Sequence, residues 1–390
     1  MTRPLTRREL LERAALGGAA LTLPGFLAAC GGDDAATVAT TATGGGEKKL
    51  ASQLRFANWQ LYIDIDEKTK KSPTLQQFQQ DTGIAVEYFE EINSNDEYFG
   101  KIQGPLSKGD GIDREIVVLT DNSRYPGLMV DEGWVLELDK EKIPNIGNLI
   151  DAQASPPFDP DRTYSLPWQS GITGIAYNEK LTSKPITSME QLLTDPALKG
   201  KVTLLNEMAD TVGLVMMLNG ADPSAVTDEA FDAALAPIRE AVEKGQIRQF
   251  TGNDYSGPLA KGDLVAAVAW SGDLVQLQAD NPSLKWNVPD DGGGIWTDNM
   301  LIPLGGDVEK ASTFMNFVYD PKIAAQIAAY VNYVTPVKGA KEELAKTDAE
   351  TAANPLIFPD DATLAKVKQF DSKALGNQDY IEKWQGLLGA

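Results

Sequence analysis

The chain has 390 residues, of which 42% are hydrophobic and 23% are charged, a balance typical of a globular protein large enough to form two lobes. Its formal net charge of −21 disfavours nucleic acid and anionic lipid as partners, although acidic residues can also serve only to solvate a surface. It has no histidine and one cysteine, which excludes histidine-based catalytic sites, zinc sites of histidine or cysteine, and disulfides.

Residues 1–30 are typical of an export signal. Paired Arg7 and Arg8 precede an apolar segment that is too short and too interrupted to span a bilayer, and the paired arginines favour the twin-arginine route. The segment ends in Leu-Ala-Ala-Cys, so we expect cleavage before Cys30, acylation of Cys30, and anchoring outside the cytoplasm, in the periplasm or on the cell surface. The alternative is a chance cysteine at an ordinary cleavage site.

A flexible tether and an α/β lobe are expected next. Residues 31–50 are rich in glycine, alanine and threonine and have too little apolar content to fold. Beyond them strand-like and helix-like segments alternate, which predicts an α/β lobe. The expected elements are a strand at 54–57, a helix at 74–80 ended by Gly83, and strands at 84–89 and 115–119.

A second series of the same kind begins near residue 177 and predicts a second lobe. Its expected elements are a helix at 188–193, a strand at 202–205, helices at 211–218 and 228–242, and a strand at 264–270. Later expected elements, which the pattern alone assigns to neither lobe, are a strand at 300–304, helices at 308–319 and 322–330, and an amphipathic segment at 363–388.

Aromatic and acidic residues recur at the ends of the expected strands, where open α/β sheets place their ligand contacts. Trp296 and Asp298 are two residues apart, so in an extended strand both side chains project to the same face. No phosphate-binding loop, dinucleotide-binding glycine motif or complete calcium loop occurs. The candidates for ligand binding at strand ends are Trp59, Tyr62, Glu207, Asp210, Trp270, Trp296 and Asp298.

These residue types suit an alkyl chain that carries ammonium groups. Carboxylates form charge-assisted hydrogen bonds with each ammonium, while aromatic faces cover the methylenes and add cation–π attraction. Other interpretations stay open at this point. Any single tryptophan could be a packing residue, Glu207 or Asp210 could cap the following helix, and the same pattern would suit a sugar.

At these residues the chain resembles the spermidine/putrescine-binding proteins of ABC importers, over nearly all of the mature chain from about residue 54. The motifs that carry the resemblance are Asn58-Trp59-x-x-Tyr62, Phe158-Asp159-Pro160-Asp161, Tyr164-Ser165-Leu166-Pro167-Trp168, Gly174-Ile175-Ala176-Tyr177-Asn178, Gly294-Ile295-Trp296-Thr297-Asp298 and Tyr333-Val334-Thr335-Pro336. The resemblance implies an α/β, two-lobed type II periplasmic-binding-protein fold, with mixed-sheet lobes, hinge strands and a ligand cleft between them. Lobe 1 would comprise residues 51–176 and 297–340, and lobe 2 residues 177–296 and 341–390.

The resemblance also implies a role for individual residues. Glu207 and Asp210 would bind one terminal amine, and Asp298 another near the hinge. The remaining residues expected in the cleft are Trp59, Tyr62, Thr120, Trp270, Trp296 and Tyr333. The chain departs from the family pattern at Leu61 and Asn122, where Asp121 could offer a replacement charge, and around Gln369 and Phe370, where the family's glutamine has no clear match.

The function expected from the sequence is that of a monomeric, lipid-anchored receptor that captures a polyamine such as putrescine or spermidine and delivers it to an ABC import permease. No catalytic role, cofactor, metal or nucleic acid is expected. One alternative is a receptor for a sugar or another small cationic solute. Another is a secreted glycosidase that uses paired carboxylates such as Glu207 and Asp298.

Overall fold

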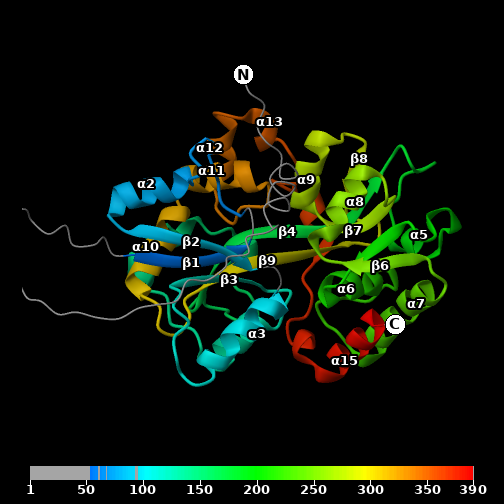
Figure 1. Ribbon diagram of the computed structural model, residues 1–390, viewed down its shortest axis with the longest axis horizontal. Coiled ribbons are helices and arrows are strands. Elements are labelled where there is room, and N and C mark those ends of the chain that lie inside the picture. The colour runs from blue at the N-terminus through cyan, green and yellow to red at the C-terminus, as the bar shows by residue number, and fades with distance from the viewer. Residues whose placement is uncertain (1–52, 60–61, 67, 93–94, 390) are drawn as a thin grey trace, which may run out of the picture.

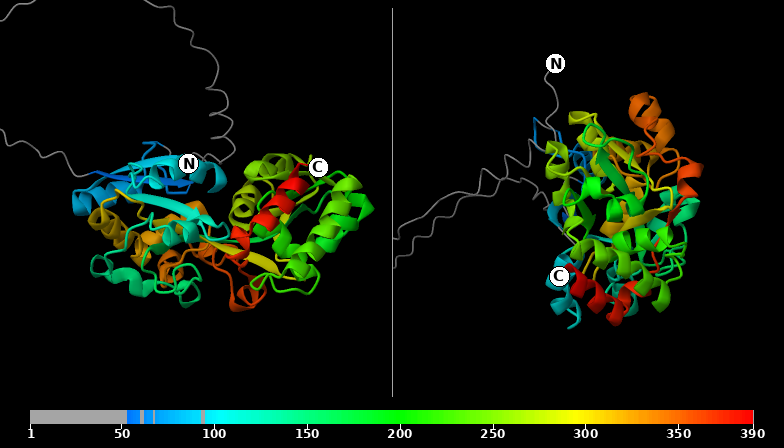
Figure 2. Two further views of the ribbon diagram at one scale, coloured as in Figure 1. Left: turned by 90° about the horizontal axis from the view of Figure 1, so that it is seen from below. Right: turned by 90° about the vertical axis from the view of Figure 1, so that its right-hand side faces the viewer.

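The structure is a computed structural model that describes residues 53–59, 62–66, 68–92 and 95–389 (Figure 1). The predicted signal, the tether and the acylation site at Cys30 lie outside the described residues. Two lobes lie side by side, and the C-terminal helix packs on the lobe that contains the middle of the chain (Figure 2).

Within the described residues, ten strands join into one hydrogen-bonded sheet with the order β2-β1-β3-β9-β4-β7-β5-β6, while β10 pairs with β9 and β8 with β4. The strands are β1 (Gln53–Trp59), β2 (Ala85–Ile92), β3 (Ile116–Thr120), β4 (Ser165–Asn178), β5 (Val202–Leu205), β6 (Ile247–Thr251), β7 (Ala266–Trp270), β8 (Leu284–Asn287), β9 (Gly293–Leu301) and β10 (Val367–Lys368). We call the part around β1, β2 and β3 lobe 1, and the part around β5, β6, β7 and β8 lobe 2.

The long strands β4 and β9 connect the two lobes near the centre of the molecule (Figure 1). β9 pairs with β3 of lobe 1 at residues 298–301, and β4 pairs with β7 of lobe 2 at residues 173–177. β4 and β9 pair antiparallel with each other over residues 165–173 and 294–301. Side chains in the middle of both strands therefore lie where the lobes meet.

Helices cover both faces of the sheet. They are α2 (Pro73–Thr82), α3 (Asn95–Leu106), α4 (Tyr125–Asp131), α5 (Met189–Thr194), α6 (Met208–Leu218), α7 (Asp228–Glu243), α8 (Ser256–Lys261), α9 (Ser271–Asp280), α10 (Val308–Val318), α11 (Pro321–Val331), α12 (Ala340–Ala345), α13 (Ala349–Ala352), α14 (Asp361–Leu364) and α15 (Gln378–Leu388). In lobe 1, α2, α10 and α11 bury one face, and α3 and α4 bury the other. In lobe 2, α15 joins the core formed by α5, α6 and α7.

Strand β3, in which every residue before Thr120 is apolar, shows why lobe 1 needs two helical layers. Ile116 and Val118 pack in the core beneath α10 and α11, whereas Val117 and Leu119 pack against α3 and α4. Alternate side chains of a strand point to opposite faces, so a run of consecutive apolar residues in a strand must be covered on both sides.

Local sequence signals set the ends of several helices. Ser72 accepts a hydrogen bond from the N–H of Leu75 before α2, and Gly83 ends that helix with φ of 75°. Ser188 and Gln191 form a reciprocal capping box at the start of α5. These signals explain why both helices were predicted close to their observed positions.

Most of the expected helices and strands are confirmed, although some of them begin or end at other residues than expected. The strand at 202–205 is β5, but α6 begins at Met208, three residues before the expected start. The strand expected at 300–304 is wrong in its bounds, because β9 covers Gly293–Leu301 and most of it precedes residue 300. The amphipathic segment expected at 363–388 runs from the end of α14 through β10 and a 3₁₀ turn to α15. The lobe boundaries expected at 176/177 and 296/297 fall inside β4 and β9 and stay a prediction.

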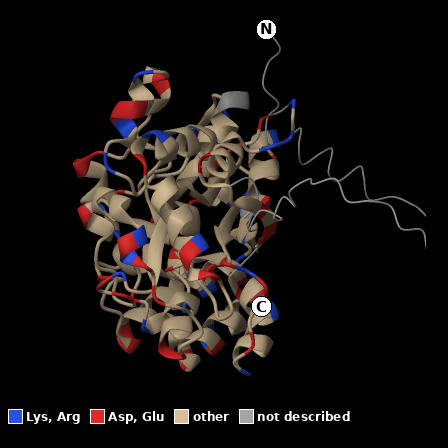
Figure 3. Cartoon of the chain, turned by 90° about the vertical axis from the view of Figure 1, so that its left-hand side faces the viewer, with Lys and Arg blue, Asp and Glu red and all other residues tan. Residues whose placement is uncertain are grey.

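On the side of the molecule that Figure 3 faces, acidic and basic positions are scattered over helices and loops. Ion pairs such as Lys101 with Glu97 and Lys142 with Glu309 join exposed side chains. In the part of the chain that the structure describes, no helix has both the length and the apolar character needed to cross a membrane.

Candidate functional site

Asp298 lies on β9 between the lobes and is 3% exposed. Its Oδ2 accepts a hydrogen bond from the hydroxyl of Tyr62 at 2.7 Å, and its Oδ1 accepts one from the hydroxyl of Thr120 at 2.6 Å. Asn95 in turn holds Thr120, since its amide donates to Thr120 Oγ1 at 3.2 Å and accepts from the Thr120 N–H at 3.0 Å. Burial raises the pKa of Asp298 to about 6, although both hydroxyls act to lower it.

Asp210 is the corresponding carboxylate of lobe 2 and is also 3% exposed. Its Oδ1 accepts a hydrogen bond from the hydroxyl of Thr173 at 2.7 Å, and its Oδ2 accepts one from Nε1 of Trp270 at 3.0 Å. Burial raises the pKa of Asp210 to about 6, while hydrogen bonds from Thr173, Trp270 and Asn122 lower it. Because Asp210 binds side chains of β4 and β7, the interpretation of this residue as a helix cap is wrong.

Glu207 stands immediately before α6, and its side chain makes no capping hydrogen bond. Burial, followed by the negative charges of Asp210 and Asp96, raises the pKa of Glu207 to about 8. Asp96 belongs to α3 of lobe 1, so acidic side chains from both lobes act on this region. A cation placed there would relieve the mutual repulsion of these carboxylates.

Four aromatic rings form a continuous series from lobe 2 to lobe 1. The ring centroids of Trp270 and Trp296 are 6.3 Å apart, those of Trp296 and Tyr333 are 5.7 Å apart, and those of Tyr333 and Tyr62 are 5.4 Å apart. Nε1 of Trp296 donates to Thr173 Oγ1 at 3.2 Å, so Thr173 holds both this ring and Asp210. The series therefore starts and ends at a carboxylate, since Trp270 binds Asp210 and Tyr62 binds Asp298.

Two glycines make room for this series of rings. A Cβ atom at Gly171 of β4 would overlap the indole of Trp296, and a Cβ atom at Gly272 of α9 would lie 2.5 Å from the ring of Tyr333. Real Cβ atoms do not approach ring carbons so closely, so a larger residue at either position would displace the ring. The glycines are thus part of the site although they carry no functional group.

The structure adds two residues that the sequence analysis did not assign to the site. Asp273 in the first turn of α9 is 2% exposed and accepts hydrogen bonds from the hydroxyls of Tyr333 at 3.1 Å and Tyr255 at 2.9 Å. Gln369 follows β10, and its Nε2 donates to Asp121 Oδ2 at 2.6 Å. The position of Asp273 three residues after Trp270 was the available sequence signal, whereas the contact of Gln369 depends on chain crossings that the sequence does not reveal.

Most residues predicted for the site lie together. Hydrogen bonds and ring contacts join them into one connected group made of Tyr62, Thr120, Asp210, Trp270, Trp296, Asp298 and Tyr333. Glu207 is linked to this group through its electrostatic interaction with Asp210, and Asp121 through Thr297. Trp59, at the end of β1, is half-buried and packs against the cores on both faces of lobe 1.

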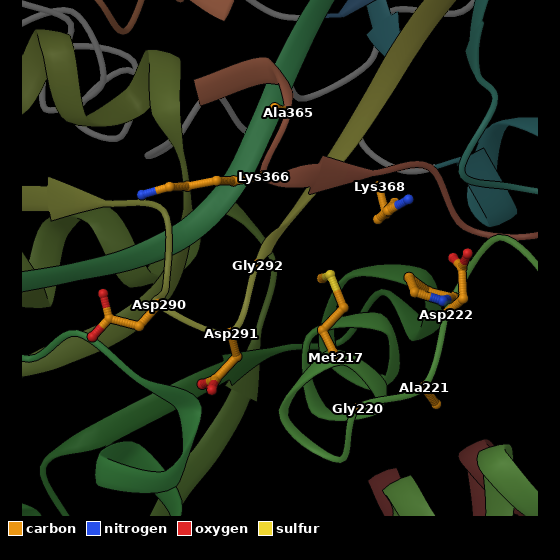
Figure 4. Close-up of a pocket in the computed structure, with 11 residues that line it drawn as sticks. Met217, Gly220, Ala221, Asp222, Asp290, Asp291, Gly292, Ala365, Lys366 and Lys368 are labelled. Atoms are coloured by element: carbon orange, nitrogen blue, oxygen red, sulfur yellow. The ribbon is translucent and has the colours of Figure 1, made fainter. Parts of the chain in front are cut away.

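A surface pocket of about 350 Å³ lies elsewhere in lobe 2, between the loop after α6, the turn before β9 and the segment around β10. None of the predicted site residues lines this pocket. In Figure 4, Asp222 and Lys368 lie on one side of it and Asp290 and Lys366 on the other, rather than around a common centre.

Two lobes that share two strands and enclose buried carboxylates and rings define a solute-binding protein of the two-lobed, type II class. Residues 74–359, well over half of the chain, match the profile of a family described as bacterial extracellular solute-binding protein, and the chain belongs to this family. Its members are solute-binding proteins of transport systems rather than enzymes, so the glycosidase alternative is set aside.

Individual relatives agree with this assignment. The spermidine/putrescine-binding periplasmic protein of Escherichia coli K12 is 27% identical over 338 residues, which cover 86% of this chain and 91% of that protein. The putrescine-binding periplasmic protein PotF of the same organism is 25% identical over 333 residues, 80% of this chain and 85% of that protein. The crystal structure of the spermidine/putrescine substrate-binding protein PotD of Streptococcus pneumoniae is 26% identical, with a TM-score of 0.71 over 86% of this chain and 98% of that chain. The predicted fold class is confirmed.

Proposed function

We propose that this protein is an extracytoplasmic receptor that binds a polyamine of the putrescine or spermidine kind between its lobes. The observation that supports the proposal most directly is the pair of buried carboxylates, Asp210 of lobe 2 and Asp298 next to lobe 1, at the two ends of one series of aromatic rings. A hydrocarbon chain with an ammonium group at each end would match both the rings and the acids.

The electrostatics of the proposed site support a cationic ligand over a sugar. Burial raises the pKa of Asp210 and Asp298 to about 6, and burial with the negative charges of Asp210 and Asp96 raises that of Glu207 to about 8; no cationic side chain among the described residues offsets these shifts. An ammonium would supply the missing charge. A neutral sugar would supply only hydrogen bonds and would leave the buried negative charges uncompensated.

The named ligands of the relatives support the same class of ligand, since their names give spermidine and putrescine. In our proposal Tyr62, Thr120, Trp270, Trp296 and Tyr333 surround the ligand, and Trp59 approaches it from lobe 1. Gln369 takes the place of the glutamine that the resemblance leads us to expect from the C-terminal segment.

The proposal includes a membrane anchor and a transport partner. Acylation at Cys30 would keep the receptor beside a membrane, where it would deliver its ligand to an ABC import permease as a monomer. This part depends on the signal in residues 1–30 and on the transport role of the family. Detergent phase partition of the native protein and of Cys30→Ala would test it, because only the acylated chain should enter the detergent phase.

Calorimetry and thermal unfolding with a panel of solutes test the ligand class. Putrescine, spermidine and cadaverine are compared with glucose and maltose on the purified protein. We expect at least one amine to bind with a micromolar or lower Kd and to raise the Tm, and the sugars to have no effect. Binding of a sugar, or no response to any amine, would contradict the proposal.

A further inference from the structure

Asp121 is a buried carboxylate whose two oxygens are both occupied by donors of the protein. It follows β3 and is 3% exposed. Its Oδ1 accepts a hydrogen bond from the N–H of Thr297 at 2.7 Å, and its Oδ2 accepts one from Nε2 of Gln369 at 2.6 Å. The N–H of Asp121 also donates to the carbonyl of Thr297 at 2.9 Å. Asp121 therefore bridges the segment between Trp296 and Asp298 to the C-terminal segment.

The two partners of Asp121 come from different parts of the fold. Thr297 lies on β9, next to Asp298. Gln369 directly follows β10, which pairs with β9 at Gly293 and Gly294. Phe370, the next residue, is buried in the core of lobe 2. The hydrogen bond between Asp121 and Gln369 thus joins the end of a lobe 1 strand to a segment that is fixed in lobe 2.

The chemistry of a primary amide gives this contact a directional consequence. The amide of glutamine has an N–H₂ donor on one side and an oxygen acceptor on the other. An ionised carboxylate can only accept, so ionised Asp121 selects the N–H₂ side of Gln369 and leaves its Oε1 pointing away. An oxygen in that orientation can accept a hydrogen bond from a ligand ammonium, whereas the reversed amide would present N–H groups and repel it.

We propose that Asp121 is a positioning residue of the amine site, which acts on the ligand through Gln369 by holding the Gln369 amide with its oxygen toward the cleft. This inference rests on the proposed function. It differs from the expectation that Asp121 contacts the ligand with its own charge, because here Gln369, which Asp121 holds, makes that contact.

Replacement of Asp121 by asparagine should reverse the Gln369 amide. An asparagine side chain has one acceptor, but Thr297 and Gln369 present two donors. The backbone N–H of Thr297 is fixed in β9, so the asparagine oxygen would turn to Thr297 and its N–H₂ group to Gln369. Gln369 would then accept this hydrogen bond through Oε1 and point its own N–H₂ group at the ligand.

A double-mutant cycle measured by calorimetry with putrescine tests the positioning role. We expect Asp121→Asn and Gln369→Leu each to weaken binding about tenfold or more, the loss expected when a charged ligand group loses a hydrogen bond. The double variant should bind within threefold of Gln369→Leu alone, because Asp121 acts only through Gln369. Losses that multiply in the double variant would show a direct contact of Asp121 and overturn the proposal, as would unchanged affinity of Asp121→Asn.

A matched control separates positioning from general stability. Gln326 of α11 donates to Asp64 Oδ2 at 2.6 Å, so it forms the same type of acid–amide pair inside lobe 1. Gln326→Leu should lower the Tm and leave the putrescine Kd within threefold of wild type. Thermal unfolding of all variants shows that they are folded before affinities are compared.

A second measurement does not need any ligand. The side-chain amide resonances of Gln369, assigned by their loss in Gln369→Leu, should shift as Asp121 titrates. Burial raises the pKa of Asp121 to about 7, the N–H of Thr297, Arg162 and Gln369 lower it, and Asp298 raises it. We expect an inflection near pH 7 in wild type and none in Asp121→Asn. If no amine binds to the wild-type protein, the proposed function fails, but this titration still tests the role of Asp121. Gln369 amide resonances that do not change with pH would overturn the positioning role.

Discussion

Trp270 donates a hydrogen bond from its indole Nε1 to Oδ2 of Asp210 at 3.0 Å, so the ring proposed to cover the methylenes of the ligand is held by the carboxylate proposed to bind its amine. The other carboxylate has a similar arrangement, since Asp298 holds the hydroxyl of Tyr62. A binding site whose rings and charges fix each other is preorganised, and less side-chain entropy is lost when the ligand binds.

Thr173 should matter for binding although it carries no charge. Its hydroxyl donates to Asp210 and accepts from Trp296, so Thr173→Val removes one hydrogen bond from each group, while Asp210 keeps the one from Trp270 and the shape of the side chain is preserved. We expect affinity for the cognate amine to fall about tenfold. Calorimetry measures this change.

Thr203 offers a control for that variant. It is also fully buried in a strand, β5, but its hydroxyl has no hydrogen-bond partner in the part of the chain that the structure describes. Thr203→Val should leave affinity unchanged and keep or raise the Tm, because no hydrogen bond is lost. Equal loss of affinity in both variants would contradict a specific role of Thr173.

The sequence predicted the elements with clear periodicity and missed those without it. β5 was found at its observed residues because a short apolar run follows a turn. β4 was not predicted, since Pro167, Gly171 and Gly174 interrupt a segment that is buried along its whole length and shows no alternation. This strand is polar and irregular because it passes between the lobes and contributes Thr173 to the site.

Site residues could be predicted where the chemistry of a single side chain points to ligand binding. They could not be predicted where their role depends on a contact with a distant residue. The tryptophans and carboxylates at strand ends could be named from the sequence. The partnership of Asp121 with Gln369 spans 248 positions, and the contact of Asp273 with Tyr333 spans 60. Such contacts depend on how the crossing strands bring distant segments together, which local patterns do not encode.

Gly171 should be sensitive to the addition of a single methyl group. In Gly171→Ala the new Cβ would overlap the indole of Trp296, which would have to leave its place between Trp270 and Tyr333. We expect at least a tenfold loss of affinity and a change in tryptophan fluorescence.

The control for Gly171→Ala is Gly100→Ala. Gly100 lies in α3, and a Cβ atom there would meet no atom within 4 Å. Alanine favours a helix over glycine by about 1 kcal/mol, so this variant should be slightly more stable and should bind normally. Normal binding by Gly171→Ala would show that the indole has another position compatible with the ligand.

The variant Asp298→Asn should lower ligand affinity without lowering the stability of the protein. Asp298→Asn removes a buried negative charge and keeps the size of the side chain, so the unliganded protein should be at least as stable at pH 8 as wild type. The ligand ammonium would lose its charged partner, and we expect affinity to fall about 100-fold or more. Calorimetry and thermal unfolding of the same preparation test both effects; a variant that loses stability and keeps affinity would remove Asp298 from the site.

The pH dependence of the unliganded protein should have an unusual sign. Burial raises the pKa of Asp210 and Asp298 from 3.8 to about 6, and burial with the nearby negative charges raises the pKa of Glu207 from 4.5 to about 8. Between pH values of about 4 and 8 the folded protein therefore holds more protons at these groups than the unfolded chain does. Their contribution to the free energy of unfolding falls as pH rises through this range.

Urea unfolding between pH 5 and pH 8 measures this slope in wild type, Glu207→Gln and Asp298→Asn. We expect Glu207→Gln to flatten the slope up to about pH 8, and Asp298→Asn to flatten it only up to about pH 6. Asp348→Asn is the control of opposite sign, because hydrogen bonds from Thr351 lower the pKa of this exposed carboxylate and its contribution to the free energy of unfolding is lost as pH falls.

Stabilisation by a bound amine should depend on pH in the opposite way, because the amine needs ionised carboxylates. We therefore expect the rise in Tm caused by putrescine to be larger at pH 8 than at pH 5. A larger rise at pH 5 would mean that the ligand does not bind to these acids.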